Sequence, residues 1–588
     1  MADTLASKRL EEFLKESPNA TKEEIAGFNK LVEDYFTGQM TPDEFKGRRL
    51  MMGTYGIRNT KDIHMMRIKI PAGKVNAEQL EALADVADSY SKGIGHWTTR
   101  QDMQLYWIPT KESPVVMAKC AAVGLTTREA CGNSVRNVTA CPFAGVSPSE
   151  LFDVTGHAEA IMRHFLRNKA SQNLPRKFKI ALEGCPTDHA KTAIHDIGAV
   201  AAVQMVGGKK QLGFKVYIGG GLGAAPMQAI LLEPFTPVED FLRTCEAAVR
   251  IHDRLGNRKN KAQARIKFVV KTLGADKFRQ EVFAEREKLP KYTYPEMYVT
   301  ETDEKPGVAQ NVPPVMNVNG TFKRWMFTNV IGQKQDGFST VTIRLRLGDQ
   351  SSKQMRELAK ILRKFGASCR VVITQNLMLR WVRNEHLQAL FAALEPLGMA
   401  ETEAEKLYDV TSCPGAETCQ LGISASRGLA RALESEMKKA NLTGEDIDNV
   451  RIKVSGCPNS CGQHHIADIG FFGGAKKVGE HLAPHFQLMV GGMTEEGKAV
   501  FAQNVIKLPA KRIPDAVIKM LELYRKDRTS PKETFPNFSG RVGVVYWKAA
   551  LEPFTTLPAY EQTPEAYRDW GAEEEFSLGG MGPGECAA

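Results

Sequence analysis

Four cysteines in the C-terminal half of the chain have the residue type and spacing of a metal site. They form two pairs, Cys413-x5-Cys419 in TSCPGAETCQLG and Cys457-x3-Cys461 in VSGCPNSCGQHHIADIGFFGG. The surrounding Gly, Pro, Ser and Asn residues build tight turns, in which sulfur atoms and backbone N–H groups can face one buried object. Four thiolates suit zinc or an iron–sulfur cluster, and the x5 and x3 spacings fit paired zinc knuckles poorly. We therefore favour a four-iron cluster over zinc and over buried, unligated cysteines.

The composition is that of a globular chain with a positive charge. Its 588 residues allow three or four domains, and 43% of them are hydrophobic. Eleven cysteines, an odd number, favour a reducing compartment over a disulfide framework. The start of the chain lacks an apolar signal region, and no stretch approaches the roughly 20 apolar residues of a membrane span. We expect a cytoplasmic protein, or a plastid stroma protein if a transit peptide has been removed, with no membrane contact.

The net charge of +10 is spread along the chain and not concentrated in one long basic block. This distribution argues against a nucleic-acid-binding tail. It fits either a solubilising surface or a positive field that attracts anionic substrates or an acidic partner protein.

Two segments of the chain share a strand–helix–strand pattern. In the first, the strand MMRIKIP (65–71) precedes an amphipathic helix, and the strand TTRQDMQLYWIP ends at Pro109. In the second, VTIRLRL (341–347), KQMRELAKILRKFG and VVITQNLMLRWV follow the same order, with Gln375 and Trp381 in the places of Gln101 and Trp107. Each unit is typical of an α/β layer.

The similarity continues into the cysteine region, where matched positions are 272 residues apart. Where the second copy has Cys419 and Cys461, the first has Ser147 and His189, so the first copy cannot complete a four-thiolate site. We expect the cluster in the C-terminal copy only, and we interpret Cys141 and Cys185 as buried structural cysteines. The matched pairs are Cys141 and Cys413, Cys185 and Cys457, Asp196 and Asp468, and Gly219 and Gly491.

The repeat predicts an α/β (α+β) fold built from two pseudo-symmetric copies of one two-part module. The Pro-rich, polar stretch between the copies lacks periodicity and reads as a connection. We expect an N-terminal helical arm (1–60), paired half domains (61–125 and 335–400), a first module domain without a cluster (126–287), a linker (288–334), a second module domain with the cluster (401–545) and a C-terminal tail (546–588).

Basic residues concentrate in the first copy near predicted strand ends. Arg67 and Lys69 alternate on one strand, Arg136 precedes the Cys141 turn, and Lys177 and Lys179 alternate in PRKFK. A solvated face is the ordinary explanation of such charges. Alternation with apolar residues weakens it, because a cation on a buried strand is costly unless an anion meets it. The pattern therefore suggests anion recognition.

With both copies described, the chain resembles the siroheme-containing sulfite and nitrite reductases, most closely the ferredoxin-type assimilatory sulfite reductase hemoprotein. The family signature is C-x5-C followed by C-x3-C, and the family likewise contains two pseudo-symmetric copies, whose ferredoxin-like half domains pair and are followed by siroheme/Fe–S α/β domains. The resemblance implies a [4Fe–4S] cluster on Cys413, Cys419, Cys457 and Cys461, with a siroheme beside it. It makes Cys461 the thiolate shared by the cluster and the siroheme iron.

The resemblance also implies two groups of basic side chains. The residues that match substrate-binding, catalytic positions are Arg67, Arg136, Lys177 and Lys179. The residues that resemble positions holding the macrocycle carboxylates are Arg100, Gln101, Arg258, Arg265 and Lys267. Tyr55 and Cys131 match positions near the substrate side of the cofactor in some relatives.

The implied reaction is the six-electron reduction of sulfite to sulfide, with reduction of nitrite to ammonia as the alternative. We favour sulfite because the sulfite enzymes carry Lys at the place of Lys179, whereas the nitrite enzymes tend to carry Asn. The chain has no flavin or nicotinamide motif, so we expect electrons from ferredoxin or, as a second choice, from a flavoprotein subunit. A non-catalytic iron–sulfur carrier, a redox sensor or a zinc-structured protein would keep the cysteines without needing the four substrate-side cations.

Overall fold

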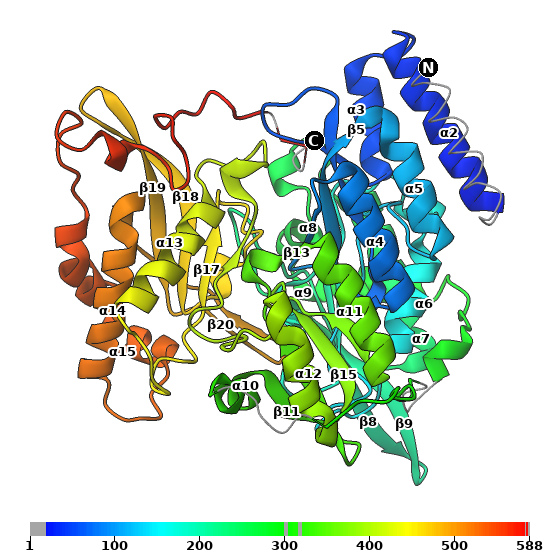
Figure 1. Cartoon of the computed structure of the whole chain (residues 1–588). Helices are drawn as coiled ribbons and strands as arrows, with labels where there is room; N and C mark the ends of the chain where they lie inside the picture. Colours follow the sequence, from blue (N-terminus) through cyan, green and yellow to red (C-terminus); the bar gives the residue numbers. More distant parts are fainter. Residues whose placement is uncertain (1–18, 299–303, 315–319, 583, 586–588) are drawn as a thin grey trace. The chain divides into compact units, whose positions relative to one another are not determined.

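The computed structural model describes residues 19–298, 304–314, 320–582 and 584–585. The chain divides into two compact units, Met1–Gly221 with Gln228–Ala400, and Leu222–Met227 with Glu401–Cys586 (Figure 1). The first 18 residues of the predicted N-terminal arm and Cys586 of the predicted tail lie outside the described residues. No helix among the described residues has the length and apolarity needed to cross a membrane.

The first unit contains two five-stranded sheets with the same strand order. One sheet has the order β1 (Thr54–Gly56), β2 (Ile63–Ile68), β5 (Met103–Pro109), β4 (Ile94–Trp97) and β13 (Asp349–Ser351). The other has the order β11 (Val330–Gly332), β12 (Phe338–Ile343), β15 (Leu377–Arg383), β14 (Ser368–Val371) and β3 (Lys74–Val75). The last strand of each sheet comes from the other copy of the repeat. This exchange of strands joins the two half domains into one body.

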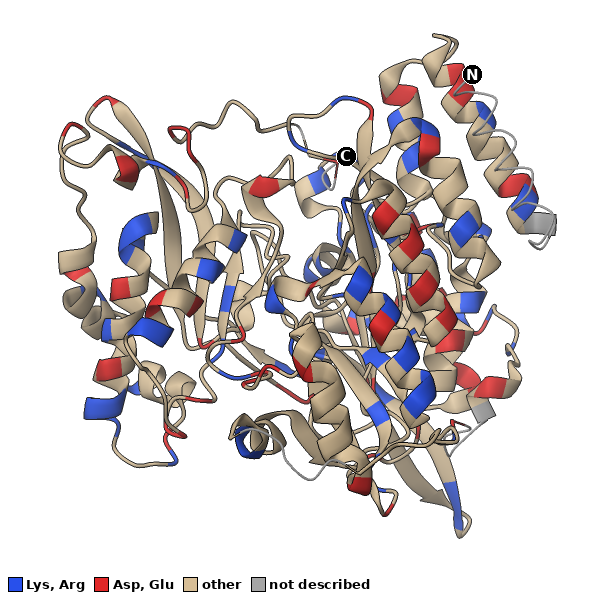
Figure 2. Cartoon of the chain, viewed as in Figure 1, with Lys and Arg blue, Asp and Glu red and all other residues tan. Residues whose placement is uncertain are grey.

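One helix from each copy covers these sheets, and the two helices lie side by side in Figure 1. They are α4 (Ala77–Tyr90) and α11 (Ser352–Phe365), and both begin with a capping box. Acidic side chains of α4 face basic side chains of α11 (Figure 2). Arg363 pairs with Glu81 at 2.5 Å. These exposed pairs contribute little to stability and mainly fix the register of the two helices.

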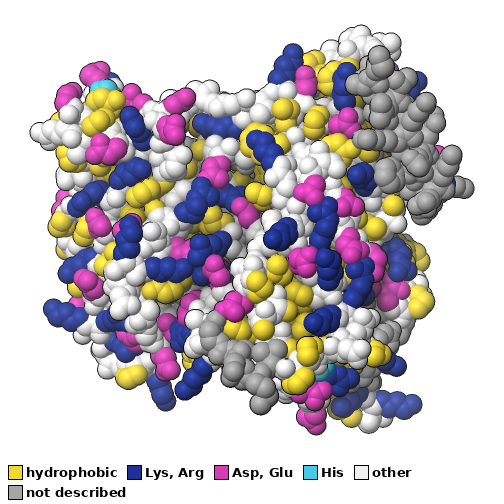
Figure 3. Space-filling model, in the orientation of Figure 1, with side chains coloured by type: hydrophobic (Ala, Val, Ile, Leu, Met, Phe, Trp, Pro, Cys, Tyr) yellow, Lys and Arg dark blue, Asp and Glu magenta, His cyan; other side chains and the backbone are white. Residues whose placement is uncertain are grey.

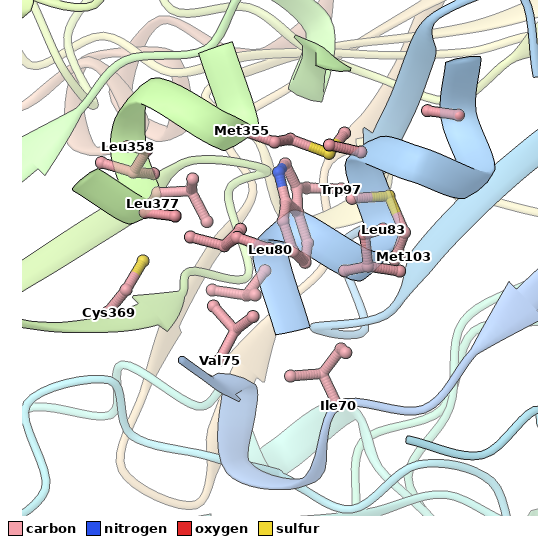
Figure 4. Packing of buried hydrophobic residues seen from close by; sticks show 14 of the residues in the cluster. Ile70, Val75, Leu80, Leu83, Trp97, Met103, Met355, Leu358, Cys369 and Leu377 are labelled. Atoms are coloured by element: carbon pink, nitrogen blue, oxygen red, sulfur yellow. The ribbon is translucent and has the colours of Figure 1, made fainter. Parts of the chain in front are cut away.

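The apolar faces of both helices meet in a shared core (Figure 4). Leu80, Leu83, Met355 and Leu358 are fully buried there around Trp97. The Trp97 indole N–H donates to the Gln350 side chain across the copies at 2.9 Å, which satisfies a polar group that burial would otherwise penalise.

The repeated glutamine and tryptophan are places where the backbone turns. Gln101 and Gln375 have φ values of 55° and 73°, and Trp107 and Trp381 have values of 67° and 62°. A positive φ is uncommon for such residues, so its occurrence at all four positions indicates that the copies share the same local bends.

The remaining two sheets also match each other. In the first unit the order is β10 (Ile230–Pro237), β9 (Lys209–Ile218), β8 (Ile197–Val206), β7 (Ile180–Glu183) and β6 (Thr139–Ala140). In the second unit it is β22 (Gln503–Pro509), β19 (His481–Val490), β18 (Ile469–Val478), β17 (Ile452–Ser455) and β16 (Thr411–Ser412). In each sheet the three strands next to the cysteine turns are parallel: β6, β7 and β8 in the first unit, and β16, β17 and β18 in the second. The predicted two-copy α/β fold is therefore confirmed.

The glycine run at 219–223 belongs to a turn that both copies share. The Gly219 N–H donates to the Asp196 carbonyl at 2.9 Å, and the Gly491 N–H donates to the Asp468 carbonyl at 3.0 Å. The run is accordingly a structural turn that recurs in the second copy.

Helices complete both units. In the first unit they are α2 (Asn19–Phe36), α3 (Pro42–Met51), α5 (Ser113–Ala122), α6 (Thr155–Phe165), α7 (Val238–Leu255), α8 (Ile266–Leu273), α9 (Ala275–Arg286), α10 (Thr321–Asn329) and α12 (Leu387–Leu394). In the second unit they are α13 (Ser426–Lys439), α14 (Ile513–Asp527) and α15 (Phe535–Leu551), with short β20 (Met493–Glu495) and β21 (Lys498–Val500). Basic and acidic side chains are interspersed over the face shown in Figure 3, so the excess positive charge forms no single patch there.

The segment predicted as a linker contains ordered structure. Helix α10 lies within this segment. Its fully buried Trp325 packs edge-to-face against Phe391, with the two ring centres 5.3 Å apart. Nearer its middle, the Glu304 carboxylate lies 3.3 Å from Arg370 and 3.1 Å from Arg380, both buried cations of the second half domain. Residues 299–303 and 315–319 of this predicted linker lie outside the described residues.

Candidate active site

Two of the four predicted substrate-binding cations meet at Tyr55 in the first unit. Tyr55 lies on β1, beside the Arg67 strand β2. The Arg67 guanidinium carbon is 5.1 Å from the centre of the Tyr55 ring, and Arg136 Nη2 donates to the Tyr55 hydroxyl at 3.3 Å. One aromatic side chain thus gathers two cations that are 69 positions apart in the sequence.

Arg136 is also fixed by the loop that contains Cys131. Its Nη1 donates to the Ala130 carbonyl at 2.9 Å, and its Nη2 and Nε donate to the Gly132 carbonyl at 2.7 and 3.1 Å. The planar fork of the guanidinium suits this arrangement, which a lysine could not reproduce. Arg136 is therefore held rigidly beside Tyr55.

The main chain places the two lysines next to Arg136. Phe178, the buried residue between them, pairs with Val135 in a parallel bridge. The Arg136 N–H donates to the Phe178 carbonyl at 2.9 Å. Lys177 and Lys179 are half-buried on either side of Phe178, just before β7 begins at Ile180. The structure therefore brings Arg67 and Arg136 together at Tyr55, and it places the segment of Lys177 and Lys179 beside Arg136 through main-chain contacts.

Lys69 does not belong to this group, although the alternation places it on the face of Arg67. Strand β2 ends at Ile68, and Lys69 is 1% exposed with its ammonium 3.6 Å from the buried carboxylate of Glu129. Burial lowers the pKa of Lys69 to about 8, which the Glu129 charge opposes. We therefore assign Lys69 to the core as an ion pair.

A second buried acid lies under the cationic region. Burial raises the pKa of Asp102 to about 6, although Arg67, Arg100 and other neighbouring cations lower it. The positive charges of this region thus outnumber the nearby carboxylates Asp102 and Glu129, which is the electrostatic setting that an anionic ligand requires.

Two of the residues predicted to hold macrocycle carboxylates bind the protein main chain. The Gln101 amide donates to the carbonyls of Val371 and Ala140 at 2.8 and 3.0 Å and accepts from the Ala140 N–H. Arg100 donates to the Asn137 carbonyl, and burial lowers its pKa to about 10. Gln101 is completely buried, so the structure gives it a part in joining segments, and its proposed cofactor contact stays a prediction.

The other three candidates differ in their surroundings. Arg265 forms a two-pronged ion pair with the buried carboxylate of Asp196, at 2.8 to 2.9 Å. Arg258 is exposed and pairs with Asp253 at 2.6 Å. Lys267 is 4% exposed, and burial lowers its pKa to about 8. Their roles toward a cofactor also stay predictions.

The four cluster cysteines lie on two neighbouring turns of the second unit. Cys413 follows β16 and Cys457 follows β17, and these parallel strands place their carboxyl ends at one edge of the sheet. The Gly456 N–H donates to Cys413 Sγ at 3.2 Å. Exposure increases from the buried Cys413, through the partly buried Cys419 and Cys457, to the exposed Cys461.

Glycines allow the two cysteine turns to touch. A side chain on Gly456 would place its Cβ 2.6 Å from the Gly415 Cα and 2.8 Å from the Ser424 carbonyl. The Gly456 carbonyl accepts from the N–H groups of Ile423 and Ser424. The close approach thus depends on glycine at two positions.

The C-terminal tail supports the first cysteine turn, a contact that the sequence did not indicate. The Asp569 carboxylate accepts from the Ala425 N–H at 2.6 Å, and the Gly582 N–H donates to the Gln420 carbonyl at 3.1 Å. Burial raises the pKa of Asp569 to about 6. The tail is therefore part of the support of the Cys419 loop.

Two family models match the chain. The "Nitrite and sulphite reductase 4Fe-4S domain" matches residues 131–291 and 403–557, and the "Nitrite/Sulfite reductase ferredoxin-like half domain" matches residues 55–123 and 331–397. The chain belongs to the nitrite and sulfite reductase family. Members of this family are oxidoreductases that carry a siroheme and a [4Fe–4S] cluster.

Some similar members of the family are named nitrite reductases and others are named sulfite reductases. The chain is 28% identical to "Assimilatory ferredoxin-dependent nitrite reductase" of Haloferax mediterranei, over 93% of the chain and 94% of that protein. It is 28% identical to the chloroplastic ferredoxin–nitrite reductase of Oryza sativa subsp. japonica, over 80% of the chain and 76% of that protein. It is 26% identical to "Sulfite reductase [ferredoxin] 1" of Mycolicibacterium paratuberculosis, over 85% of the chain and 88% of that protein.

A solved structure has the same fold. The NirA protein of Mycobacterium tuberculosis matches with a TM-score of 0.76 at 24% identity, over 91% of this chain and 98% of that one.

The residues present fit the cofactors of the family. Four thiols on two touching turns suit a cluster in which each cysteine binds one iron. The Gly456 N–H that points at Cys413 Sγ is the kind of hydrogen bond that stabilises a cluster thiolate. The excess of cations in the first unit suits a macrocycle rich in carboxylates as well as an oxyanion.

Proposed function

We propose that this reductase converts sulfite to sulfide in a six-electron reaction with ferredoxin as the electron donor. The observation that supports the proposal is the meeting of Arg67 and Arg136 at Tyr55, with the segment of Lys177 and Lys179 joined to Arg136 through the main chain. Fully deprotonated sulfite is a doubly charged oxyanion, whereas nitrite carries one charge. Four cations in one region match the more highly charged substrate better.

In this proposal the arginines bind and orient the substrate. Arg136 is fixed by the carbonyls of Ala130 and Gly132, so it loses little freedom when it meets an anion. Arg67, over the Tyr55 ring, adds a second fixed charge. Their charges stabilise the negative oxygen atoms of the substrate as its bonds to the central atom weaken.

The lysines supply protons. Each oxygen of sulfite leaves as water, so protons must reach the leaving oxygen at every stage. Lys177 and Lys179 flank the buried Phe178 on one short segment, and an ammonium next to the substrate can donate a proton and be replenished by solvent. Both lysines are half-buried, which keeps them close to water.

The cofactors supply the electron chemistry when they are bound. Cys413, Cys419, Cys457 and Cys461 would hold the [4Fe–4S] cluster. Cys461, the most exposed of the four, would also help to hold the siroheme. Arg100, Arg258, Arg265 and Lys267 would neutralise carboxylates of the macrocycle, with Gln101 fixing the segments between them.

Nitrite reduction to ammonia is the second candidate, supported by relatives with nitrite reductase names at 28% identity. The test is kcat/KM for both substrates with reduced ferredoxin, in the wild type and in Lys179→Asn. We expect the wild type to favour sulfite, and the variant to lose about 10-fold or more on sulfite relative to nitrite, as expected for one charged contact. A wild-type preference for nitrite would overturn the substrate assignment.

The proposed donor has its own test. Relatives of both kinds are named as ferredoxin enzymes, which supports ferredoxin over a flavoprotein subunit. The net charge of +10 suits an acidic partner, so turnover should fall steeply as ionic strength rises. Turnover that is indifferent to salt would count against electrostatic docking. A reducing compartment, the cytoplasm or the plastid stroma, fits such a donor.

A further inference from the structure

The first module has a second donor set at the place that corresponds to the cluster of the second module. Its ligand atoms all lie within 4.8 Å of one another, which is a compact group for two thiols, a carboxylate and an imidazole. The four residues are Cys141, Glu183, Cys185 and His189, and they correspond to Cys413, Ser455, Cys457 and Cys461.

The same strand arrangement assembles both sets. Cys141 follows β6 and Cys185 follows β7, and these strands are parallel neighbours. Cys141 Sγ lies 3.4 Å from His189 Nδ1, and His189 Nδ1 lies 3.7 Å from Glu183 Oε1. The two cysteines and Glu183 are at most 1% exposed, while the His189 side chain is 28% exposed. An ion could therefore reach the group past the imidazole.

Glu183 distinguishes this set from the cluster site. In the second module, the Ser455 hydroxyl accepts from the Gly462 N–H at 3.1 Å. In the first, Glu183 Oε2 accepts from the equivalent Ala190 N–H at 2.8 Å, and Oε1 accepts from the Cys185 N–H at 2.9 Å. The longer side chain keeps the amide contact of the serine and adds a carboxylate oriented by two N–H groups, as metal-binding carboxylates commonly are.

The size and chemistry of the set indicate one ion. Each cysteine of a four-iron cluster binds its own iron, so such a site spreads its sulfurs apart, whereas this group converges on one point. Two thiolates, one imidazole nitrogen and one carboxylate oxygen are ligands that zinc accepts in tetrahedral geometry. A buried carboxylate beside two thiols is also costly unless a cation is present.

We propose that Cys141, Glu183, Cys185 and His189 bind one Zn²⁺ ion, which joins the ends of β6 and β7 in the first module. The site is independent of the reductase reaction proposed above. It revises our interpretation of Cys141 and Cys185 as unligated structural cysteines.

The test is metal analysis of the purified holoenzyme from zinc-supplemented medium, with zinc and iron counted separately per chain. We expect about one zinc per chain in the wild type, as for a structural site. His189→Ala, at the partly exposed ligand, and Cys185→Ala should both lose the zinc. The control Cys245→Ala, which changes a completely buried cysteine of α7, should keep it.

Zinc-edge X-ray absorption of the wild type should show two sulfur neighbours at about 2.3 Å and nitrogen or oxygen neighbours at about 2.0–2.2 Å. This readout does not depend on how well any variant folds. Wild-type enzyme without zinc, zinc that persists in both ligand variants, or a Cys141–Cys185 disulfide in a non-reducing digest would each overturn the proposal. Sulfite reduction can fail or succeed without affecting any of these outcomes.

Discussion

Adding one methyl group at Gly456 should separate the two cysteine turns. The φ of Gly456 lies outside the left-handed region, so backbone strain does not forbid alanine there. The obstacle is contact, because the new Cβ would lie 2.6 Å from the Gly415 Cα and 2.8 Å from the Ser424 carbonyl. Carbon atoms pack at about 3.5–4.0 Å, so the turns must move apart by about 1 Å.

That movement breaks the hydrogen bonds that join the turns. The Gly456 carbonyl accepts from Ile423 and Ser424 at 2.8 and 3.2 Å, and its N–H donates to Cys413 Sγ at 3.2 Å. Lengthening each by about 1 Å loses about 1 kcal/mol per bond. Forcing atoms into a filled site adds about 1–3 kcal/mol. We expect Gly456→Ala to destabilise the cysteine turns by about 4–6 kcal/mol.

The assay is iron per chain in freshly purified protein, together with the Tm and the far-ultraviolet circular dichroism. Gly456→Ala should retain little iron and show a lower Tm, with its secondary structure largely preserved. The repeat provides the control, because a Cβ at the corresponding Gly184 in the first module has one tight contact, 3.0 Å from the Phe152 carbonyl, and otherwise ordinary contacts with Glu150. Full iron content and an unchanged Tm in Gly456→Ala would refute the steric argument.

Three further changes test other parts of the structure. Glu304→Gln leaves two buried guanidinium groups, of Arg370 and Arg380, without their carboxylate and should cost about 3–5 kcal/mol at pH 7. Burial alone would raise the pKa of Glu304, but Arg380 and Arg370 outweigh burial and lower this pKa to about 2. The stability contributed by the Glu304 carboxylate is therefore full above its unfolded pKa of about 4.3 and disappears as the pH falls toward 2. A Tm deficit in Glu304→Gln that stays constant across this pH range would contradict the pairing. Arg136→Lys keeps the charge but not the fork, so kcat/KM should fall about 10- to 100-fold, while the same change at an exposed arginine of α11 should leave it unaltered. Asp569→Ala should speed the loss of iron in air, whereas Asp569→Asn retains the acceptor oxygen and should behave nearly as the wild type. Equal rates of iron loss in the wild type and both variants would exclude a role for the tail.

The features that could be predicted from the sequence are those that the repeat states twice. Matched turns such as those at Asp196 and Asp468 recur at a constant spacing, so the two copies and the incomplete thiol set of the first copy followed from the residues, whereas the pairing of the half domains was implied by the family resemblance. The spacing of Cys413, Cys419, Cys457 and Cys461 likewise sufficed to favour a cluster. Such signals are local and repeated, which makes them readable without a structure.

What could not be predicted depends on contacts between distant segments. The alternation of Arg67 and Lys69 suggests a common face, but Lys69 is buried because Glu129, far along the chain, provides a counter-charge. The support of the Cys419 turn by Asp569 has no local signal for the same reason. The carboxylate of Glu183 was detectable in principle, since it replaces Ser455 in the repeat, but a comparison limited to cysteine positions overlooks it.

The exchange of β3 and β13 has a consequence for how the chain is made. His96 on β4 and Asp349 on β13 are 253 positions apart, so the first sheet cannot be completed until the ribosome has begun the second half domain. Until then the edge of β4 stays open to other chains, which favours aggregation and slow folding. Between two separate half-domain chains, the same reciprocal exchange of strands would hold the chains together. Cutting the present chain between the copies should therefore yield fragments that fold only when both are expressed in the same cell.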